Sequence, residues 1–386
     1  MRFIELLCRH DRSKTALITE SGTYTYGDII NAASAVTEPE SGLWVIRSET
    51  VYGELVSFLA AKNSVPIIIQ NGEVGRCDIP PNADFAVSSS GSTGTPKLMF
   101  RTAQSWYKFF DEQNRVFSIN SSSTLFMHGS LCFSGNLNII LGALYAGAAV
   151  IISKGRLTRE RMYDIEKYGA DIVYLIPDKL NMLCKYYKGR RTVKSVIAGS
   201  QSMGTDEAVK LQKALGTERV ILYYGASEVS YISYLDILSE NRERSCIGRP
   251  FNGIEISCDN GFLEVMSDYT VIGAAKPYRM ADIITRDSDG YIYFNGRRDD
   301  VLNIGGEKLS ASALENEIKA TGGIDDACVF LQHGENGREI LCCAYVGKHE
   351  AGNIRLFYMP KRWYKVSEIP KNANGKTDRE KTAQWL

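Results

Sequence analysis

Hydrophobic and polar positions alternate regularly through the middle of the chain. Short apolar runs are each followed by a longer stretch in which apolar residues recur at helical spacing; the runs are DFAVS (84–88), TLFMH (124–128), AVIIS (149–153), DIVYLI (171–176), SVIAG (195–199) and RVILYYG (219–225). Repeated strand–helix units of this kind predict a parallel sheet covered by helices, so we expect an α/β fold built from layered βα units.

Beyond Ser245 the sequence pattern changes from strand–helix units to short strands and turns. The segments GIEISCDNGFLEVMS (253–267) and SDGYIYFNG (288–296) are short strands in which DNG and SDG are typical hairpin turns, which predicts a smaller β-rich subdomain. The charged, turn-prone residues 297–300 mark a boundary. We therefore expect a large body at residues 1–298 and a small, mobile α+β C-terminal domain at residues 299–386.

Three turns in the predicted α/β region are candidates for a ligand site. They are the loop after DFAVS, the turn that ends SVIAGS (195–200) and the turn that ends ILYYGASE (221–228). Ligands of parallel sheets sit at the carboxyl ends of the strands, so we expect these three turns to share one pocket.

The loop Ser88–Lys97 (SSSGSTGTPK) has the most distinctive composition of the three. It combines six hydroxyl side chains with two glycines and a lysine. Glycines let backbone N–H groups turn toward an anion, hydroxyls add neutral donors and the lysine adds a cation, which indicates a phosphate site. By composition alone, a flexible surface loop is the commoner reading.

The overall composition excludes several classes of function. With 45 basic and 45 acidic residues, the chain has no general attraction for nucleic acid or an anionic membrane. Four histidines without an HExxH motif argue against a protein-ligated metal centre. Nine cysteines without a CxxC pair, and a start without a secretory apolar region, predict reduced thiols in the cytoplasm. No apolar run has the length of a membrane span.

An ordered series of motifs along the chain indicates a family resemblance. SSSGSTGTPK is followed by YYGASE (223–228), IGRPFNGIEI (247–256), YRMAD (278–282), GRRDDVLNIGGEKLSASALENEI (296–318) and PKNANGK (370–376). This series resembles the adenylate-forming superfamily, which comprises acyl- and aryl-CoA ligases, adenylation domains of peptide synthetases and luciferases. Six matches in the right order are far more specific than any one of them.

The resemblance implies two half-reactions, in which a carboxylic acid and ATP give acyl-AMP and pyrophosphate, and a thiol then takes the acyl group. Lys376 would be the catalytic lysine, Ser227 would donate to the α-phosphate, and Glu228 would hold Mg²⁺. The residues expected to wrap the β- and γ-phosphates are Ser89, Ser90, Gly91, Ser92, Thr93, Gly94, Thr95 and Lys97.

The resemblance also places the nucleoside and the moving parts. Tyr224, with Gly225 in the same motif, would lie beside adenine, and Asp282 and Arg297 would lie at the ribose. Asp299 would be the hinge of the C-terminal domain. The remaining matched pair, expected along the path of the thiol, is Gly305 and Gly306.

The acid itself is only partly constrained. Amino-acid-activating relatives carry an aspartate in an F-D-x-S segment, and the corresponding residues 128–135 contain no acid, so an α-amino acid is disfavoured in favour of an acyl or aryl acid. The pocket candidates are His128, Phe133, Gly199 and Ser200. A lone histidine in an apolar segment is, however, more often a satisfied core residue.

Other readings stay open. The thiol could belong to coenzyme A or to the phosphopantetheine of a carrier protein acting in trans, and a homo-oligomer could supply a wall of the pocket. A non-catalytic member of the family could bind nucleotide or an acyl group as a sensor. A phosphotransferase using Gly375-Lys376-Thr377 as a Walker loop is weakened because Pro370 stands where that motif needs glycine.

Overall fold

The computed structural model describes residues 2–70, 74–75, 77–89, 97–153, 157–187, 192–297, 300–304, 307–321, 323–333, 339–348, 359–371 and 377–386. Contacts divide the chain into two compact units. Unit 1 comprises Met1–Arg242, Pro250–Glu255 and Met266–Tyr278, and unit 2 comprises Glu243–Arg249, Ile256–Val265 and Arg279–Leu386. The boundary expected between residues 298 and 299 lies outside the described residues and stays a prediction.

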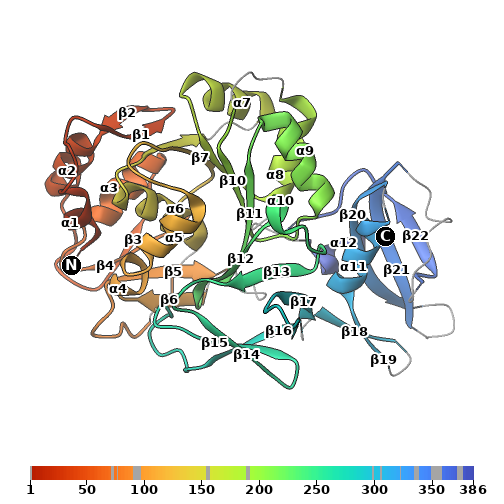
Figure 1. Ribbon diagram of the computed structural model, residues 1–386. Helices are drawn as coiled ribbons and strands as arrows, with labels where there is room; N and C mark the ends of the chain where they lie inside the picture. The colour runs from red at the N-terminus through yellow and green to blue at the C-terminus, as the bar shows by residue number, and fades with distance from the viewer. Residues whose placement is uncertain are drawn as a thin grey trace. The chain divides into compact units, whose positions relative to one another are not determined.

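The main sheet of unit 1 confirms the predicted α/β architecture (Figure 1). Neighbouring strands β11, β10, β9, β7, β8 and β1 are all parallel, and β12 and β2 pair antiparallel with the two outer members of this run. Their bounds are β1 Thr15–Thr19, β2 Gly22–Thr25, β7 Thr124–His128, β8 Ala149–Ser153, β9 Ile172–Tyr174, β10 Ser195–Ala198, β11 Arg219–Ala226 and β12 Ser230–Asp236.

Helices connect these strands, as their amphipathic spacing predicts. Pro177 at the first turn of α8 and Gly216 in the left-handed conformation after α9 are two of the local signals that set helix ends. The helices of unit 1 are α1 Phe3–Leu7, α2 Tyr26–Ala35, α3 Val51–Ala60, α4 Gln104–Tyr107, α5 Phe110–Phe117, α6 Ser134–Tyr145, α7 Thr158–Lys167, α8 Pro177–Tyr186, α9 Thr205–Leu215 and α10 Ile237–Glu240.

One predicted strand pairs differently from expectation. The run DFAVS forms β5 Phe85–Ser89, which pairs antiparallel with β6 Lys97–Arg101 and is not a member of the parallel sheet. The chain returns as a hairpin, so the nearest apolar run becomes the partner. β3 Leu43–Ile46 and β4 Val65–Ile68 form a further parallel pair.

Unit 2 contains the predicted short strands. Five of its strands are neighbours in the order β14-β15-β16-β17-β13. Asn260 and Gly261, both with positive φ, turn β14 into β15, and residues 287–291 turn β16 into β17, so both predicted hairpins are confirmed. The bounds are β13 Cys246–Pro250, β14 Glu255–Asp259, β15 Phe262–Met266, β16 Tyr278–Arg286 and β17 Ile292–Arg297.

The C-terminal part of unit 2 is a small α+β arrangement. Helix α11 and strands β20 and β21 share a core that includes Leu314, Ile318 and Val329. The elements are β18 Val301–Ile304, β19 Glu307–Ser310, α11 Ala311–Ala320, β20 Ile324–His333, β21 Glu339–Gly347, β22 Arg362–Lys365 and α12 Arg379–Trp385. Throughout the described residues, no helix combines the length and apolar character that a membrane crossing needs.

Candidate functional site

The motif YYGASE ends strand β11 and forms the turn into β12. Gly225 is required here because a Cβ on it would lie 2.4 Å from the carbonyl oxygen of Ser230. The strand register also shifts between Tyr224 and Gly225, which marks a bulge. Ser227 and Glu228 therefore stand in a tight hairpin turn, half-buried.

A buried arginine anchors the main chain of this turn through hydrogen bonds. Arg101, at the end of β6, is 0% exposed. Its Nη2 donates to the Ser227 carbonyl oxygen at 2.7 Å, and its Nη1 donates to the Tyr269 carbonyl oxygen at 3.0 Å. The backbone N–H of Val271 donates to the Glu228 carbonyl oxygen at 2.8 Å. The main chain of the turn is thus hydrogen-bonded to Arg101 and to Val271, and these hydrogen bonds do not involve the Glu228 side chain.

Electrostatics connects Arg101 to Glu228. Burial lowers the pKa of Arg101 to about 9, and the negative charge of Glu228 opposes that fall, so the guanidinium stays protonated at neutral pH. Burial and Glu228 together raise the pKa of Tyr278, the first residue of YRMAD. Within the described part of the chain, Glu228 forms no ion pair. Its carboxylate is therefore a candidate ligand for a hard cation.

The N-terminus of α6 lies at the same turn. The hydroxyls of Ser134 and Ser227 are 2.9 Å apart and share a hydrogen bond. An isolated parallel bridge joins Ser88, near the end of β5, to Phe133, which precedes α6. The start of the predicted phosphate loop thus lies beside a helix N-terminus, where backbone N–H groups favour anions.

The turn that ends SVIAGS packs against strand β11 of the YYGASE motif through a tyrosine ring. Gly199 follows β10, and a Cβ on it would lie 2.3 Å from the ring of Tyr223. Ser200, in the left-handed conformation, hydrogen-bonds to Tyr223, and the Tyr223 hydroxyl is 2.7 Å from that of Tyr174 at the end of β9. The ends of β9, β10 and β11 therefore meet at one edge, as expected of neighbouring parallel strands.

His128 ends β7, two strands away from β10 in the sheet order. Its Nδ1 lies 2.7 Å from the carbonyl oxygen of Ser153, its register partner on β8. Burial, together with the positive charge of Lys179, lowers the pKa of His128 to about 4. The ring is neutral at pH 7, so its Nδ1–H donates to Ser153.

Two predicted ribose contacts belong to unit 2 and pair with each other. Asp282 in β16 is 1% exposed, and its Oδ1 accepts from Nε of Arg297 in β17 at 2.6 Å. The two residues are register partners across the hairpin.

Several predicted residues lie outside the described residues or are described only in their backbone. Ser89 ends β5 and Lys97 begins β6, and their side chains are not described. The predictions outside the described residues concern Ser90, Gly91, Ser92, Thr93, Gly94, Thr95, Asp299, Gly305, Gly306 and Lys376.

Sequence reasoning missed the residues that build the floor of this site: Arg101, Ser134, Tyr174 and Tyr223. An arginine at the end of an apolar strand is normally a solvent-exposed charge, so nothing local marks Arg101 as buried. Tyr223 lies in the motif YYGASE, but the sequence does not indicate that its ring packs against Gly199.

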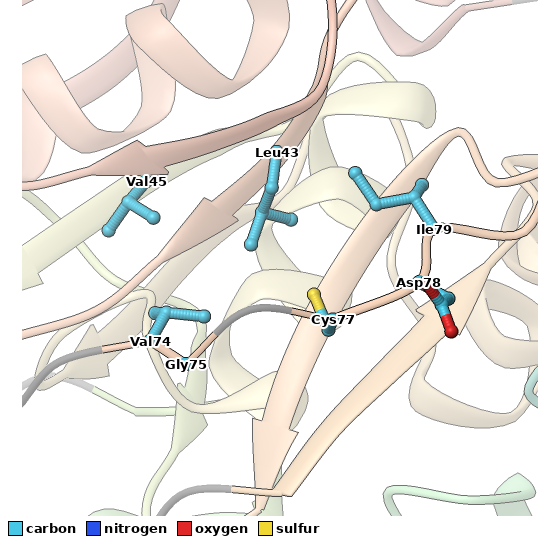
Figure 2. A pocket seen from close by; sticks show the side chains of 7 residues that line it. All are labelled: Leu43, Val45, Val74, Gly75, Cys77, Asp78 and Ile79. Carbon is cyan, nitrogen blue, oxygen red and sulfur yellow. The ribbon is translucent and has the colours of Figure 1, made fainter.

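A separate pocket of about 660 Å³ lies elsewhere in unit 1 (Figure 2). It is lined by Leu43, Val45, Val74, Gly75, Cys77, Asp78 and Ile79, none of which is a predicted site residue.

One family model and several curated relatives are similar to this chain. The family model described as AMP-binding enzyme matches residues 76–261. The acyl-CoA ligase YhfT of Bacillus subtilis, itself uncharacterised, is 22% identical over 334 residues, which cover 80% of this chain and 70% of YhfT.

Solved structures agree in fold. O-succinylbenzoate coenzyme A synthetase (MenE) from Bacillus subtilis, in complex with ATP and magnesium, has a TM-score of 0.80 at 14% identity, covering 99% of each chain. The amide bond synthetase McbA from Marinactinospora thermotolerans has a TM-score of 0.79 at 16% identity, covering 100% of this chain and 99% of its own. At these identities the likeness concerns the fold.

Proposed function

We propose that the chain is an adenylate-forming enzyme, which activates an acyl or aryl carboxylic acid with ATP and passes the acyl group to a thiol; its similarity to AMP-binding enzymes and acyl-CoA ligases supports this. In the first step a carboxylate oxygen bonds to the α-phosphorus of ATP, and the bond to the leaving pyrophosphate breaks. In the second step the thiol sulfur bonds to the acyl carbon and AMP leaves. The relatives favour this activity over the non-catalytic sensor.

One observation carries the proposal: the Ser227-Glu228 turn is anchored by Arg101 and meets the N-terminus of α6 at Ser134. Hydroxyl donors, a helix N-terminus and a carboxylate are thus gathered at the carboxyl edge of the parallel sheet. These groups suit a polyphosphate, since donors meet its oxygens and the carboxylate can share a divalent cation with it.

The roles of individual residues are part of this proposal. Glu228 would hold Mg²⁺, which neutralises phosphate charge during the displacement. Tyr224 and Gly225 would lie at adenine, Asp282 and Arg297 at the ribose, and Phe133, Gly199 and Ser200 along the acid. The thiol would be that of coenzyme A or of a carrier-protein phosphopantetheine.

The C-terminal residues would supply the moving cation. We assign Lys376 to the adenylation step, where its charge meets the negative charge that gathers between carboxylate and α-phosphate. Asp299 would be the hinge about which the C-terminal domain rotates after adenylation. The rotation would withdraw Lys376 and bring Gly305 and Gly306 to the path of the thiol.

ATP–pyrophosphate exchange over aryl, short acyl, long acyl and amino acids tests the proposal. We expect exchange with aryl or acyl acids and none with α-amino acids. Lys376→Ala should lower exchange by about a thousandfold while sparing transfer from supplied acyl-adenylate. Lys361→Ala, at an exposed position of the same unit, is the matched control and should change neither step.

The alternatives predict other outcomes. Absence of exchange with every acid, together with measurable ATP binding, would favour the sensor. ADP as the product would revive the phosphotransferase. Equal loss of both half-reactions in Lys376→Ala would overturn the assignment of that lysine.

A further inference from the structure

A group of basic side chains lies at the carboxyl edge of the parallel sheet, beyond the Ser227-Glu228 turn. His128 ends β7, Lys179 stands in the first turn of α8, and Arg161 is buried in α7. Helices α7 and α8 pack against each other (Figure 1), and α7 also packs against β8. β7, which His128 ends, is the neighbour of β9, which α8 follows, and α7 packs against α8, so the three side chains form one cluster; the charges of Lys179 and Arg161 accordingly both lower the pKa of His128.

The position of Lys179 is unfavourable for the stability of helix α8. A cation in the first turn of a helix opposes the helix dipole, and Lys179 is also half-buried. Within the described part of the chain, no carboxylate forms an ion pair with it. Burial and the charge of Arg161 lower the pKa of Lys179 to about 8. Violations of local rules of this kind are expected at functional or strained sites.

The cluster lies along the same edge as the proposed adenylation site. Lys179 follows β9, and β9 is separated from β11 by β10 alone. Two strand spacings amount to about 10 Å, which is the length of a medium acyl chain. The turn at Gly199 and Ser200 lies between them, and Asp178 beside Lys179 hydrogen-bonds to Gln201 of that turn, with Gln201 Nε2 donating to Asp178 Oδ2 at 2.7 Å.

We propose that Lys179, with Arg161, forms a cationic subsite that binds a second, distal negative charge of the acid substrate. The substrate class is then a dicarboxylic acid or another acid with an anionic far end, not a plain fatty or aryl monoacid. His128 is the neutral neighbour whose ring, fixed by Ser153, borders the subsite. The inference rests on the proposed function for the identity of the reacting end.

Matched acids test the subsite. ATP–pyrophosphate exchange is measured with straight-chain monocarboxylic acids of four, six, eight and ten carbons and with the dicarboxylic acids of the same lengths. We expect kcat/KM to favour the dicarboxylic acid by about tenfold or more for at least one length. Lys179→Met should remove most of that preference, and Lys179→Arg should keep it within about threefold. Lys185→Met, at an exposed position on the same helix, should leave the ratio unchanged.

Thermal unfolding with the free acids, without ATP, separates this inference from the proposed function. If no acid supports exchange, but octanedioate raises the Tm of the wild type and of Lys179→Arg more than that of Lys179→Met, the subsite stands and the proposed function falls. If exchange occurs without preference for any dicarboxylic acid, or if Lys179→Met weakens both acids of a pair equally, the subsite is overturned. Absence of both exchange and a Tm difference also overturns it.

Discussion

Two arginines, one in each unit, are stabilised in opposite ways: Arg101 is fully buried, whereas the Arg379 side chain is 23% exposed. Arg101 in unit 1 donates to the carbonyl oxygens of Ser227 and Tyr269, which are neutral. Arg379 in unit 2 pairs with two carboxylates, Asp300 at 2.6 Å and Glu315 at 3.1 Å. Both guanidinium groups position main chain near a predicted functional segment, yet only the second is neutralised by its direct partners.

This difference in partners determines whether the positive charge of each arginine can act on a bound ligand. The charge of Arg101 is not consumed by a carboxylate in contact with it, so it stays as a positive charge beneath the Glu228 turn, where a polyphosphate would bind. Arg379 instead clamps three elements. Asp300 precedes β18 and accepts the backbone N–H of Ser312, Glu315 lies in α11, and Arg379 begins α12. We interpret Arg101 as part of the site and Arg379 as a structural clamp.

Arg101→Met should have the largest effect. It removes the arginine donor from the Ser227 carbonyl oxygen and from that of Tyr269, which keeps the Ser230 hydroxyl at 3.3 Å, and it also changes the packing of a fully buried side chain, so we expect a loss of about 3–5 kcal/mol in the free energy of unfolding. The unanchored Ser227-Glu228 turn should lower ATP–pyrophosphate exchange at least about a hundredfold under conditions where the variant is folded. Urea denaturation and the exchange rate measure the two effects.

Arg115→Met is the control for Arg101→Met. Arg115 is a surface arginine with 55% side-chain exposure, paired with Glu112, and its loss should cost about 1 kcal/mol or less. Full exchange activity in folded Arg101→Met would show that the buried charge is structural, and the contrast between the two arginines would disappear.

Arg379→Met should be milder and should depend on pH. Burial raises the pKa of Glu315 to about 7, although Arg379 opposes the rise. Without Arg379 the pKa of Glu315 rises further, so at pH 8 the variant must either keep a buried carboxylate without its cation or take up a proton, which costs up to about 3 kcal/mol. At pH 5 Glu315 is protonated and the loss should be smaller. Hydrogen exchange of α11 and β20 amides reports the local stability, and an equal loss at both pH values would contradict the clamp.

Glu315→Gln isolates the titration. A carboxyl whose pKa is raised by folding stabilises the fold fully below its unfolded pKa of 4.5, and that contribution is lost as pH rises through the folded pKa near 7. The wild type should therefore lose up to about 3 kcal/mol of local stability between these values. Glu315→Gln should flatten this slope, as the same hydrogen-exchange peptides would show. A slope that persists in the variant would assign the titration to another group.

The pattern of the sequence predicted individual elements better than their partners. Runs 124–128 and 149–153 coincide with β7 and β8 because a buried parallel strand is a continuous apolar run bounded by turns. The same reasoning was wrong for DFAVS, because hydrophobic spacing does not specify which strand pairs with which. The turn at Ser227-Glu228 was predicted from a motif, whereas Arg101 was not, because its burial depends on Tyr269, 168 residues away.

Ser134→Ala should have the smallest effect of the series and tests the α6 side of the comparison. The substitution removes the hydrogen bond to the Ser227 hydroxyl, so the folded state should lose about 1 kcal/mol. If the Ser227 hydroxyl serves the α-phosphate, its looser orientation should lower kcat for exchange a few-fold, with little change in the KM for ATP. Ser118→Ala, at the end of α5 where the hydroxyl accepts from Arg219, is a control that removes a comparable hydrogen bond away from the turn. Equal kcat in both variants would mean that the Ser227 hydroxyl is held for the hairpin alone, and that the chemistry at this turn rests on Glu228 above the buried charge of Arg101.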